Sequence, residues 1–458
     1  MSEKTLEQLF SEGTALMNSG DLAAAEACLT TALAIHPYSG EVIANLAFLK
    51  ERQGDVVLAE RYYRQALHLL PTTLQIYLNM GVMLVKLHRF DEAKELYERA
   101  LQVDPNSPWV WSNYGVLYAC MKRDTEAEQC YRKALELDPG YQKARFNLSY
   151  ILLRQGRFEE GWYCLESREW QDLFSSYFHF PRWQGEALLG KSIVICFEGG
   201  FGDMIQFSRY ASVLKHRGAS RVSLICHPPL VTLFHTMADI DDVYSYDVDV
   251  DKSGWNYWVP MTSLPYRCGT RRESIPASIP YLYADPDKVT SCSSLFEKKS
   301  LRVGLVWQGN PLFENNEHRS IADIEMLHPL LSLDDIAFVS LQKGAGEGQL
   351  SQGLGQSLIP ANQVMHDFSD TAALIAHLDL VISVDTAVAH LAGALGKTVW
   401  VLLPNYRADW RWMTEREDSP WYPGVMRLFR QQAEEDWTDV ARRVAHDLKI
   451  WKAVKALQ

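Results

Sequence analysis

The chain has 458 residues, of which 47% are hydrophobic, and it carries a formal net charge of −12. This length is too great for a single hydrophobic core and indicates about three domains. The acidic balance disfavours general binding to nucleic acid or to an anionic membrane surface.

The sequence lacks the usual signals for membrane insertion or secretion. No stretch approaches the ~20 apolar residues of a membrane span. The first ten residues have an amphipathic helical pattern without the apolar run of a signal peptide. The eight cysteines include no Cys-x-x-Cys pair, and such unpaired thiols are typical of a reducing compartment. We therefore expect a cytoplasmic protein without a membrane span.

Alanine and proline recur with a period of 34 residues through the first third of the chain. The positions are Ala32, Ala66, Ala100 and Ala134, and Pro37, Pro71, Pro105 and Pro139. This period and these residue types are those of tetratricopeptide repeats, each a pair of antiparallel helices. Small residues such as Gly81 and Gly115 would let the paired helices cross closely. Four full repeats reach Pro139, and a fifth, ending near Trp170, is expected to cap the array.

Asparagine follows the same period on the first helix of successive repeats. The positions are Asn45, Asn79, Asn113 and Asn147. We expect them on the inward face of the array, where each amide could donate to and accept from an extended peptide backbone. The sequence leaves open a second interpretation, in which they bond to neighbouring helices. The open edge of the array would also permit self-association into a homo-oligomer.

After Trp170 the repeat pattern ends, and apolar β-branched runs alternate with amphipathic helices, the first of these from about Asp203 to Arg217. Strands are expected at Ser192–Phe197, Arg221–Cys226, Leu301–Trp307, Ala337–Gln342, Leu378–Val384 and Val399–Leu403. This order is typical of parallel sheets. The predicted fold class is α + α/β, with repeats over residues 1–170 and two Rossmann-like halves over residues 171–290 and 291–458. Such halves bind ligands at the carboxyl ends of their strands.

A glycine-rich turn, Glu198-Gly-Gly-Phe-Gly-Asp203, follows the first of these strands. A carboxylate at Asp203 could accept the proton of an attacking hydroxyl group. The competing interpretation is that Asp203 caps the helix that follows. Because the turn is not a Gly-x-Gly-x-x-Gly sequence followed by a ribose-binding acid, we expect no nicotinamide or flavin cofactor.

A second turn, Ser383-Val-Asp-Thr-Ala-Val-Ala-His390, lies between a strand and a helix in the last third of the chain. Ala387 and Ala389 leave the start of this helix accessible, so its free N–H groups could bind a diphosphate. His390, one turn into the helix, could reach the same ligand. A histidine in this position is also a common packing residue.

Two other groups of residues have simpler interpretations. The acidic run Asp247-Val-Asp-Val-Asp251 mimics a metal-binding Asp-x-Asp motif, but we interpret it as a solvated loop. The aromatic group around Trp410-Arg411-Trp412 and Trp421-Tyr422 is expected to contribute mainly to packing.

Several separated segments resemble the bacterial heptosyltransferases that use ADP-heptose, and bacterial tetratricopeptide proteins with a domain of that kind. They are Pro181-Arg-Trp-Gln-Gly-Glu186, Gly202-Asp-Met-Ile-Gln-Phe207, Gly304-Leu-Val-Trp-Gln-Gly309, Asp385-Thr386 with His390-Leu-Ala-Gly-Ala-Leu395, and Asp418-Ser-Pro-Trp-Tyr-Pro423. The resemblance implies an inverting glycosyltransferase of the GT-B fold that needs no metal ion. By the same resemblance, we expect a nucleotide sugar as substrate and no separate cofactor.

The resemblance also implies roles for individual residues. Asp203 corresponds to the catalytic base. The implied donor-binding residues are Gly202, Asn310, Arg319, Ser383, Asp385, Thr386 and His390. Ala387 stands where the heptosyltransferases commonly have glycine, which puts the identity of the donor in doubt.

Repeats with an asparagine ladder joined to a GT-B region also resemble the protein O-linked N-acetylglucosamine transferases in architecture. The sequence therefore predicts a bacterial glycosyltransferase that modifies a polypeptide held by Asn45, Asn79, Asn113 and Asn147. Two alternatives stay open at this point. The chain could be a repeat scaffold with a degenerate nucleotide-sugar domain, or a transferase that acts on a glycan or a lipid-linked acceptor.

Overall fold

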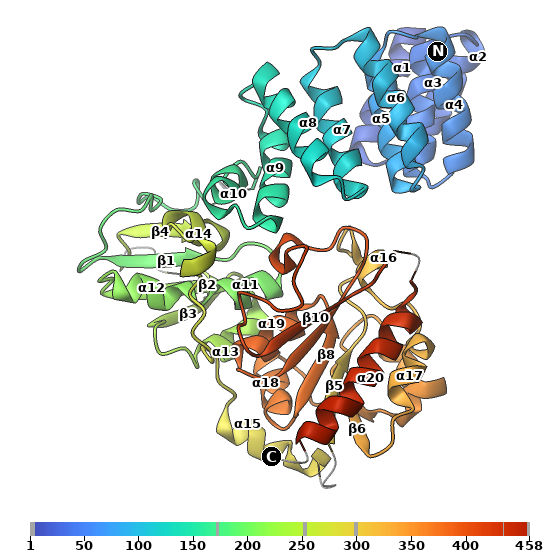
Figure 1. Cartoon of the computed structure of the whole chain (residues 1–458). Coiled ribbons are helices and arrows are strands. Elements are labelled where there is room, and N and C mark those ends of the chain that lie inside the picture. The colour runs from blue at the N-terminus through green and yellow to red at the C-terminus, as the bar shows by residue number, and fades with distance from the viewer. Residues whose placement is uncertain (1–4, 171–173, 251–253, 297–300, 434, 456–458) are drawn as a thin grey trace. The chain divides into compact units, whose positions relative to one another are not determined.

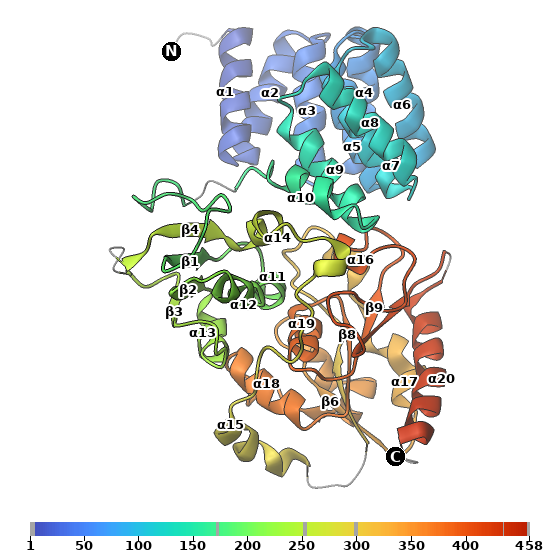
Figure 2. The same ribbon diagram turned by 60° about the vertical axis from the view of Figure 1, so that its left-hand side comes forward.

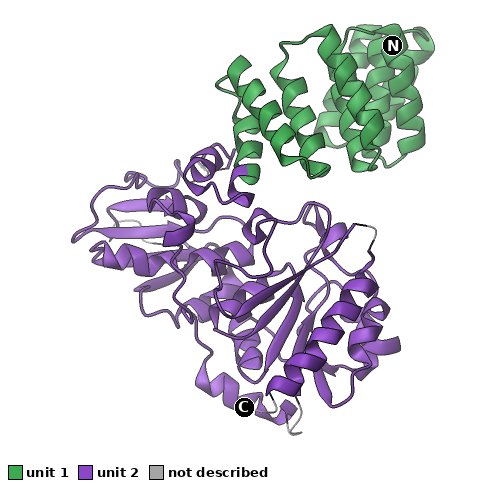
Figure 3. Ribbon diagram, in the orientation of Figure 1, with its two compact units in different colours: residues 1–151 green, residues 152–458 purple. Residues whose placement is uncertain are grey.

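The computed structural model describes residues 5–170, 174–250, 254–296, 301–433 and 435–455. The chain divides into two compact units, residues 1–151 and 152–458 (Figure 3). The first unit is helical and the second contains two parallel β-sheets (Figure 1), which confirms the predicted α + α/β class. Within the described residues, no helix has the length and apolar character needed to cross a membrane.

The first unit consists of helix pairs with the predicted period. The helices are α1 (Leu6–Ser19), α2 (Leu22–Ile35), α3 (Gly40–Arg52), α4 (Val56–Leu69), α5 (Leu74–Lys86), α6 (Phe90–Val103), α7 (Pro108–Cys120) and α8 (Asp124–Leu137). A Cβ atom at Gly81 would lie 2.5 Å from the ring of Tyr97, and one at Gly115 would lie 2.6 Å from the ring of Tyr131. The small residues are therefore needed where the paired helices cross.

The division between the units falls inside the fifth repeat, whereas the sequence placed a domain boundary near residue 170. This repeat comprises α9 (Gln142–Arg154) and α10 (Phe158–Leu165). Helix α10 belongs to the second unit because its aromatic rings pack there. The ring centroid of Trp162 lies 5.2 Å from that of Trp410, and the ring of Phe158 lies 6.2 Å from that of Trp421.

The first sheet of the second unit has the strand order β3-β2-β1-β4, with all strands parallel. Its strands are β1 (Ser192–Cys196), β2 (Arg221–Cys226), β3 (Asp242–Ser245) and β4 (Tyr257–Pro260). In β1, Ile193 pairs with Val222 of β2 on one side and with Tyr257 of β4 on the other. The associated helices are α11 (Phe201–Phe207), α12 (Tyr210–His216), α13 (Val231–Phe234) and α14 (Leu264–Arg267).

The second sheet has the order β10-β9-β8-β5-β6-β7 and is also parallel. Its strands are β5 (Leu301–Val306), β6 (Ile336–Ser340), β7 (Ile359–Pro360), β8 (Leu380–Val384), β9 (Val399–Leu403) and β10 (Met426–Arg430). The helices are α15 (Pro286–Ser291), α16 (Asn316–Arg319), α17 (His328–Leu331), α18 (Phe368–Ala376), α19 (Ala387–Ala394) and α20 (Trp437–Lys455).

Side chains alternate between the two faces of a strand, so each face of this sheet has its own covering of helices. Val303, Leu305 and Ile382 on one face share a core with Val440 and Val444 of α20. Helix α19 contacts β8 and β9, and Figure 2 shows α18 and α19 on the opposite side of the sheet from α17 and α20. In the chain, β8 ends at Val384 and α19 begins at Ala387, so the carboxyl end of β8 leads directly into α19.

The structure also departs from the sequence predictions in its secondary structure. The helix expected from Asp203 to Arg217 is divided into α11 and α12. Side chains compete for backbone carbonyls at the break: the Ser208 hydroxyl donates to the carbonyl of Ile205, and Arg209 Nε donates to that of Gln206. Strands β3, β4, β7 and β10 were also not predicted. The last residue of the acidic run, Asp251, lies outside the described residues.

Candidate functional site

The two turns singled out in the sequence meet because α11 and α19 pack directly against each other. The contact is closest at Gly202, where a Cβ atom would lie 3.0 Å from His390 Cδ2 and 3.6 Å from the Cα atom of Ala387. Glycine at this position therefore allows the two helices to approach. The approach brings Asp203 of the first half next to the start of α19 in the second.

Asp203 is the third residue of α11, whose N-cap is Gly200. Its Oδ2 atom accepts a hydrogen bond of 2.7 Å from the backbone N–H of Gly200, and its Oδ1 atom forms an ion pair with Arg411. Gly199 has a φ of +75°, and a side chain there would overlap the Asp203 carboxylate. Asp203 thus supports the start of the helix with one oxygen while the other faces a guanidinium group.

Arg411 joins the two halves of the second unit at this point. It lies in a short 3₁₀ helix, Trp410–Trp412, which follows β9. Its Nε donates to Gln206 Oε1 at 2.6 Å, its Nη1 donates to Asp409 Oδ1 at 2.9 Å, and its Nη2 contacts Asp203. The neighbouring rings of Trp410 and Trp412 are buried, as expected. Arg411 itself was not predicted to be a site residue, although an arginine between two buried tryptophans needs carboxylate partners.

The second turn lies at the carboxyl end of β8. Thr386 is the N-cap of α19, but its side chain makes no capping hydrogen bond to this helix. Its hydroxyl instead shares a hydrogen bond of 2.9 Å with the hydroxyl of Ser383, which also donates to the carbonyl of Val384. The Thr386 side chain thus does not cap the first N–H groups of α19, although the N–H of Ala389 donates to the Thr386 carbonyl at 3.1 Å.

Two ionisable side chains of this turn are strongly influenced by their surroundings. Burial and the nearby carboxylate of Asp409 raise the pKa of Asp385 to about 6, whereas Arg319 and Arg411 act in the opposite direction. Burial, together with the charges of Arg411 and other arginines, lowers the pKa of His390 well below its usual value. The imidazole is therefore neutral at pH 7.

His390 is held in place on two sides. Its Nδ1 atom shares a hydrogen bond of 2.9 Å with the hydroxyl of Tyr422, and its ring stacks on Trp412 with 5.2 Å between the centroids. These contacts fix the ring beside Gly202. His390 is therefore a packing residue, which is one of the two roles that the sequence left open. Its other ring edge faces Gly202 of α11.

Arg319 and Asn310 lie in the segment that follows β5. The guanidinium carbon of Arg319 is 4.2 Å from the ring centroid of Phe313. Its Nε atom is buried and has no hydrogen-bond partner within the described residues. Its charge acts on both Asp385 and His390, so it lies near the start of α19. Asn310 is exposed, and its Oδ1 atom accepts from the N–H of Leu312.

The four asparagines of the repeats lie on the first helices of successive pairs and are all half-buried. They are Asn45 on α3, Asn79 on α5, Asn113 on α7 and Asn147 on α9. Asn45 Nδ2 donates to Thr14 Oγ1 of α1 at 3.1 Å. Asn79 accepts from Gln75, and Asn113 donates to the carbonyl of Trp109, each within its own helix. Their part in acceptor binding stays a prediction.

The comparisons with known families agree with both parts of this architecture. Models of the tetratricopeptide repeat match residues 41–106, 72–140 and 130–163. The model of glycosyltransferase family 9 (heptosyltransferase) matches residues 365–402. That segment contains α18, β8, α19 and most of β9, and therefore includes the turn from Ser383 to His390. It does not extend to Asp203, Arg319 or Arg411.

Among curated proteins, the chain is similar to protein FlbA of Caulobacter vibrioides, with 28% identity over 335 residues. The match covers 68% of this chain and 55% of FlbA, so the chain spans about half the length of that relative.

Among solved structures, a similarity is found to Pseudomonas aeruginosa pilF, with 21% identity, a TM-score of 0.34, and coverage of 46% of this chain and 85% of the other. A thermophilic tetratricopeptide protein of Thermus thermophilus has 21% identity, a TM-score of 0.34, and coverage of 38% and 96%. The chain thus combines tetratricopeptide repeats with a domain of two parallel sheets that contains a segment of glycosyltransferase family 9.

Proposed function

We propose that this protein is an inverting glycosyltransferase that moves a sugar from a nucleotide sugar to a hydroxyl group of a polypeptide held by the repeats. The observation that carries the proposal is the meeting of Asp203 with the start of α19 across the Gly202 contact. A carboxylate and an anion-binding helix terminus are the two groups that such a transfer needs close together.

The donor diphosphate would bind at the N-terminus of α19, where the partial positive charge of the helix is concentrated. Arg319, which is half-buried, adds a positive charge, and a guanidinium group can bind two phosphate oxygens at once. The hydroxyls of Thr386 and Ser383, which already share a hydrogen bond, lie at the same terminus. These groups would stabilise the charge that develops on the leaving diphosphate, so the proposal requires no metal ion.

The transfer itself is a single displacement. The acceptor oxygen attacks the anomeric carbon as the bond from that carbon to the phosphate oxygen breaks, and the diphosphate leaves with the bonding electrons. Asp203 takes the hydroxyl proton. Arg411 contacts Asp203 from the opposite half of the unit and would hold its carboxylate in place before this step.

The donor side can be tested by thermal denaturation with a panel of nucleoside diphosphates and nucleotide sugars. One nucleotide sugar is expected to raise the apparent stability, by about 2.7 kcal/mol at a hundred times its Kd. The variant Arg319→Gln should bind this donor about 10- to 100-fold more weakly, because a charge-assisted hydrogen bond contributes roughly 1.5–3 kcal/mol.

The matched control is Arg442→Gln on α20, an exposed arginine paired with Asp439, which should leave donor affinity unchanged. If no nucleotide stabilises the protein, the transferase proposal is wrong and a repeat scaffold becomes the better account. Equal affinities for wild type and Arg319→Gln would remove Arg319 from the donor site.

The polypeptide acceptor can be tested by mass spectrometry of peptides incubated with the protein and this donor. Replacing Asn79 and Asn113 together with alanine should lower the rate of transfer to peptide about tenfold or more, since two amide contacts of about 1 kcal/mol each are removed. Hydrolysis of the donor by water should be unchanged. The control pair is Gln102→Ala and Gln129→Ala, exposed positions on α6 and α8. Transfer that depends on neither pair, or that occurs only to a glycan or a lipid-linked acceptor, would contradict the peptide proposal.

A further inference from the structure

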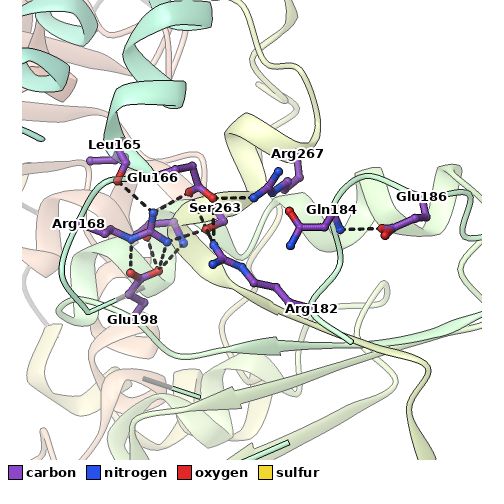
Figure 4. Close-up of polar contacts among 10 residues, drawn as sticks. Leu165, Glu166, Arg168, Arg182, Gln184, Glu186, Glu198, Ser263 and Arg267 are labelled. Atoms are coloured by element: carbon purple, nitrogen blue, oxygen red, sulfur yellow. Dashed lines mark hydrogen bonds and ion pairs between the residues drawn. The ribbon is translucent and has the colours of Figure 1, made fainter. Parts of the chain in front are cut away.

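A cluster of charged side chains connects the segment after α10 with the glycine-rich turn of the candidate site (Figure 4). At its centre is Arg168, which is only 2% exposed. An arginine side chain has five N–H donors, and Arg168 makes five hydrogen bonds to the described residues. Its Nε donates to Glu198 Oε1. Its Nη2 donates to Glu198 Oε2 at 3.0 Å and to Ser263 Oγ at 2.6 Å. Its Nη1 donates to Glu166 Oε1 at 2.6 Å and to the Leu165 carbonyl at 3.2 Å.

Glu198 is the first residue of the turn that ends at Asp203, and it is 7% exposed. Arg168 contacts both of its carboxylate oxygens, and Thr262 donates to Oε2 from its hydroxyl and from its backbone N–H. A buried carboxylate held in this way has little freedom to move, because each displacement would leave a buried polar group without its partner.

The rest of the turn transmits this constraint to Asp203. The carbonyl of Gly199 accepts a hydrogen bond of 3.0 Å from His227 Nε2, and the N–H of Gly200 donates to Asp203 Oδ2. The positive φ of Gly199 places its backbone against the Asp203 carboxylate. The turn therefore has one fixed end at Glu198 and holds the proposed base at the other.

The cluster contains a second carboxylate, which allows positioning to be distinguished from general stabilisation. Glu166 accepts hydrogen bonds of 3.0 Å from Arg182 and from Arg267, and of 2.8 Å from Ser263. Arg267 is an arginine of the same cluster, but within the described residues it has no hydrogen bond to Glu198. It is thus a natural control for Arg168.

We propose that Arg168 is a positioning residue that orients Asp203 through Glu198. The segment between the repeats and the first sheet would then be part of the support of the transfer site, although it precedes both sheets in the chain. The inference rests on the proposed function for its catalytic consequence. The effect of Arg168 on the conformation of the turn can be tested even if the proposed function is wrong.

The kinetic test is a double-mutant cycle in the full-length protein with Arg168→Gln, Glu198→Gln and the combined variant. Each single change should lower kcat for donor turnover about 10- to 100-fold, the loss expected when a catalytic group is misplaced by about 1 Å. The Kd for the donor should stay the same. If Arg168 acts through Glu198, the double variant is no worse than the poorer single variant. Multiplicative losses would overturn the proposal.

The structural test is hydrogen–deuterium exchange of the backbone amides over residues 199–203. Arg168→Gln should speed exchange there about tenfold, because the turn opens more often, whereas Arg267→Gln should leave it unchanged. Equal effects of the two variants would show general stabilisation only and would overturn the proposal. Should Arg168→Gln not fold, Arg168→Lys replaces it, since lysine keeps the charge but cannot form the two parallel bonds to Glu198. A wild type without donor turnover would contradict the proposed function, while the exchange result would still decide the role of Arg168.

Discussion

Replacing Asp203 with asparagine is expected to lower kcat for sugar transfer by about 10²–10⁴-fold, the usual contribution of a general base. Asparagine can still accept the hydrogen bond from the N–H of Gly200, so α11 should keep its start. The ion pair with Arg411 is lost, but Arg411 retains Gln206 and Asp409 as partners. Initial rates and donor affinity should be measured on the same protein sample. A lower rate with unchanged donor affinity indicates loss of the base, whereas a lower affinity indicates a disturbed site.

The matched control for this variant is Asp247→Asn in the exposed acidic loop of the first half. This change should leave both the rate and the donor affinity unaltered, because we interpret that loop as solvated. A full rate in Asp203→Asn would exclude this carboxylate as the base. A parallel loss of rate in Asp247→Asn would instead support the Asp-x-Asp interpretation of the loop.

Replacing Trp162 with alanine is expected to destabilise the second unit by about 3–5 kcal/mol, as for other large aromatic residues in a core. Trp162 is 1% exposed, packs against Trp410 and Trp421, and donates its indole N–H to the carbonyl of Thr270 at 3.0 Å. The substitution leaves both a cavity and a buried carbonyl without this donor. Chemical denaturation followed by tryptophan fluorescence reports mainly on this unit, which contains all but two of the fourteen tryptophans.

The neighbouring Tyr163 provides the control, since it is 53% exposed. Tyr163→Ala should change the stability by no more than about 0.5 kcal/mol, the usual range for surface positions. If both substitutions have the same small effect, α10 does not contribute to the core of the second unit. The division of the chain between residues 151 and 152 would then have to be reconsidered.

The repeats could be predicted in detail because their signal is local and recurs four times. Gly81 and Gly115 occupy equivalent positions in successive repeats. Gly81 faces Tyr97 and Gly115 faces Tyr131, and these two tyrosines are themselves one period apart. The central strands were also predictable, since Leu380–Val384 and Val399–Leu403 are fully buried on both faces and appear as continuous apolar runs. Shorter strands such as Asp242–Ser245, half-buried throughout, give no such run.

The site was predictable only where its residues belong to a strand-to-helix turn. Asp203 and Thr386 follow buried strands, so position and chemistry together identified them. Arg411 and Arg168 make their decisive contacts with residues 208 and 30 positions away. No periodicity in the sequence connects such pairs, and only the fold brings them together.

The contact between Arg411 and Asp203 spans the two sheets of the second unit, and this has a consequence for timing. A rotation that moves the halves apart has to lengthen or break that ion pair, because one partner follows β9 and the other follows β1. Separation of the two halves and release of the Asp203 carboxylate from Arg411 would then be a single event. In the proposed transfer, exchange of substrates would thereby be coupled to release of the proposed base from its ion-pair partner.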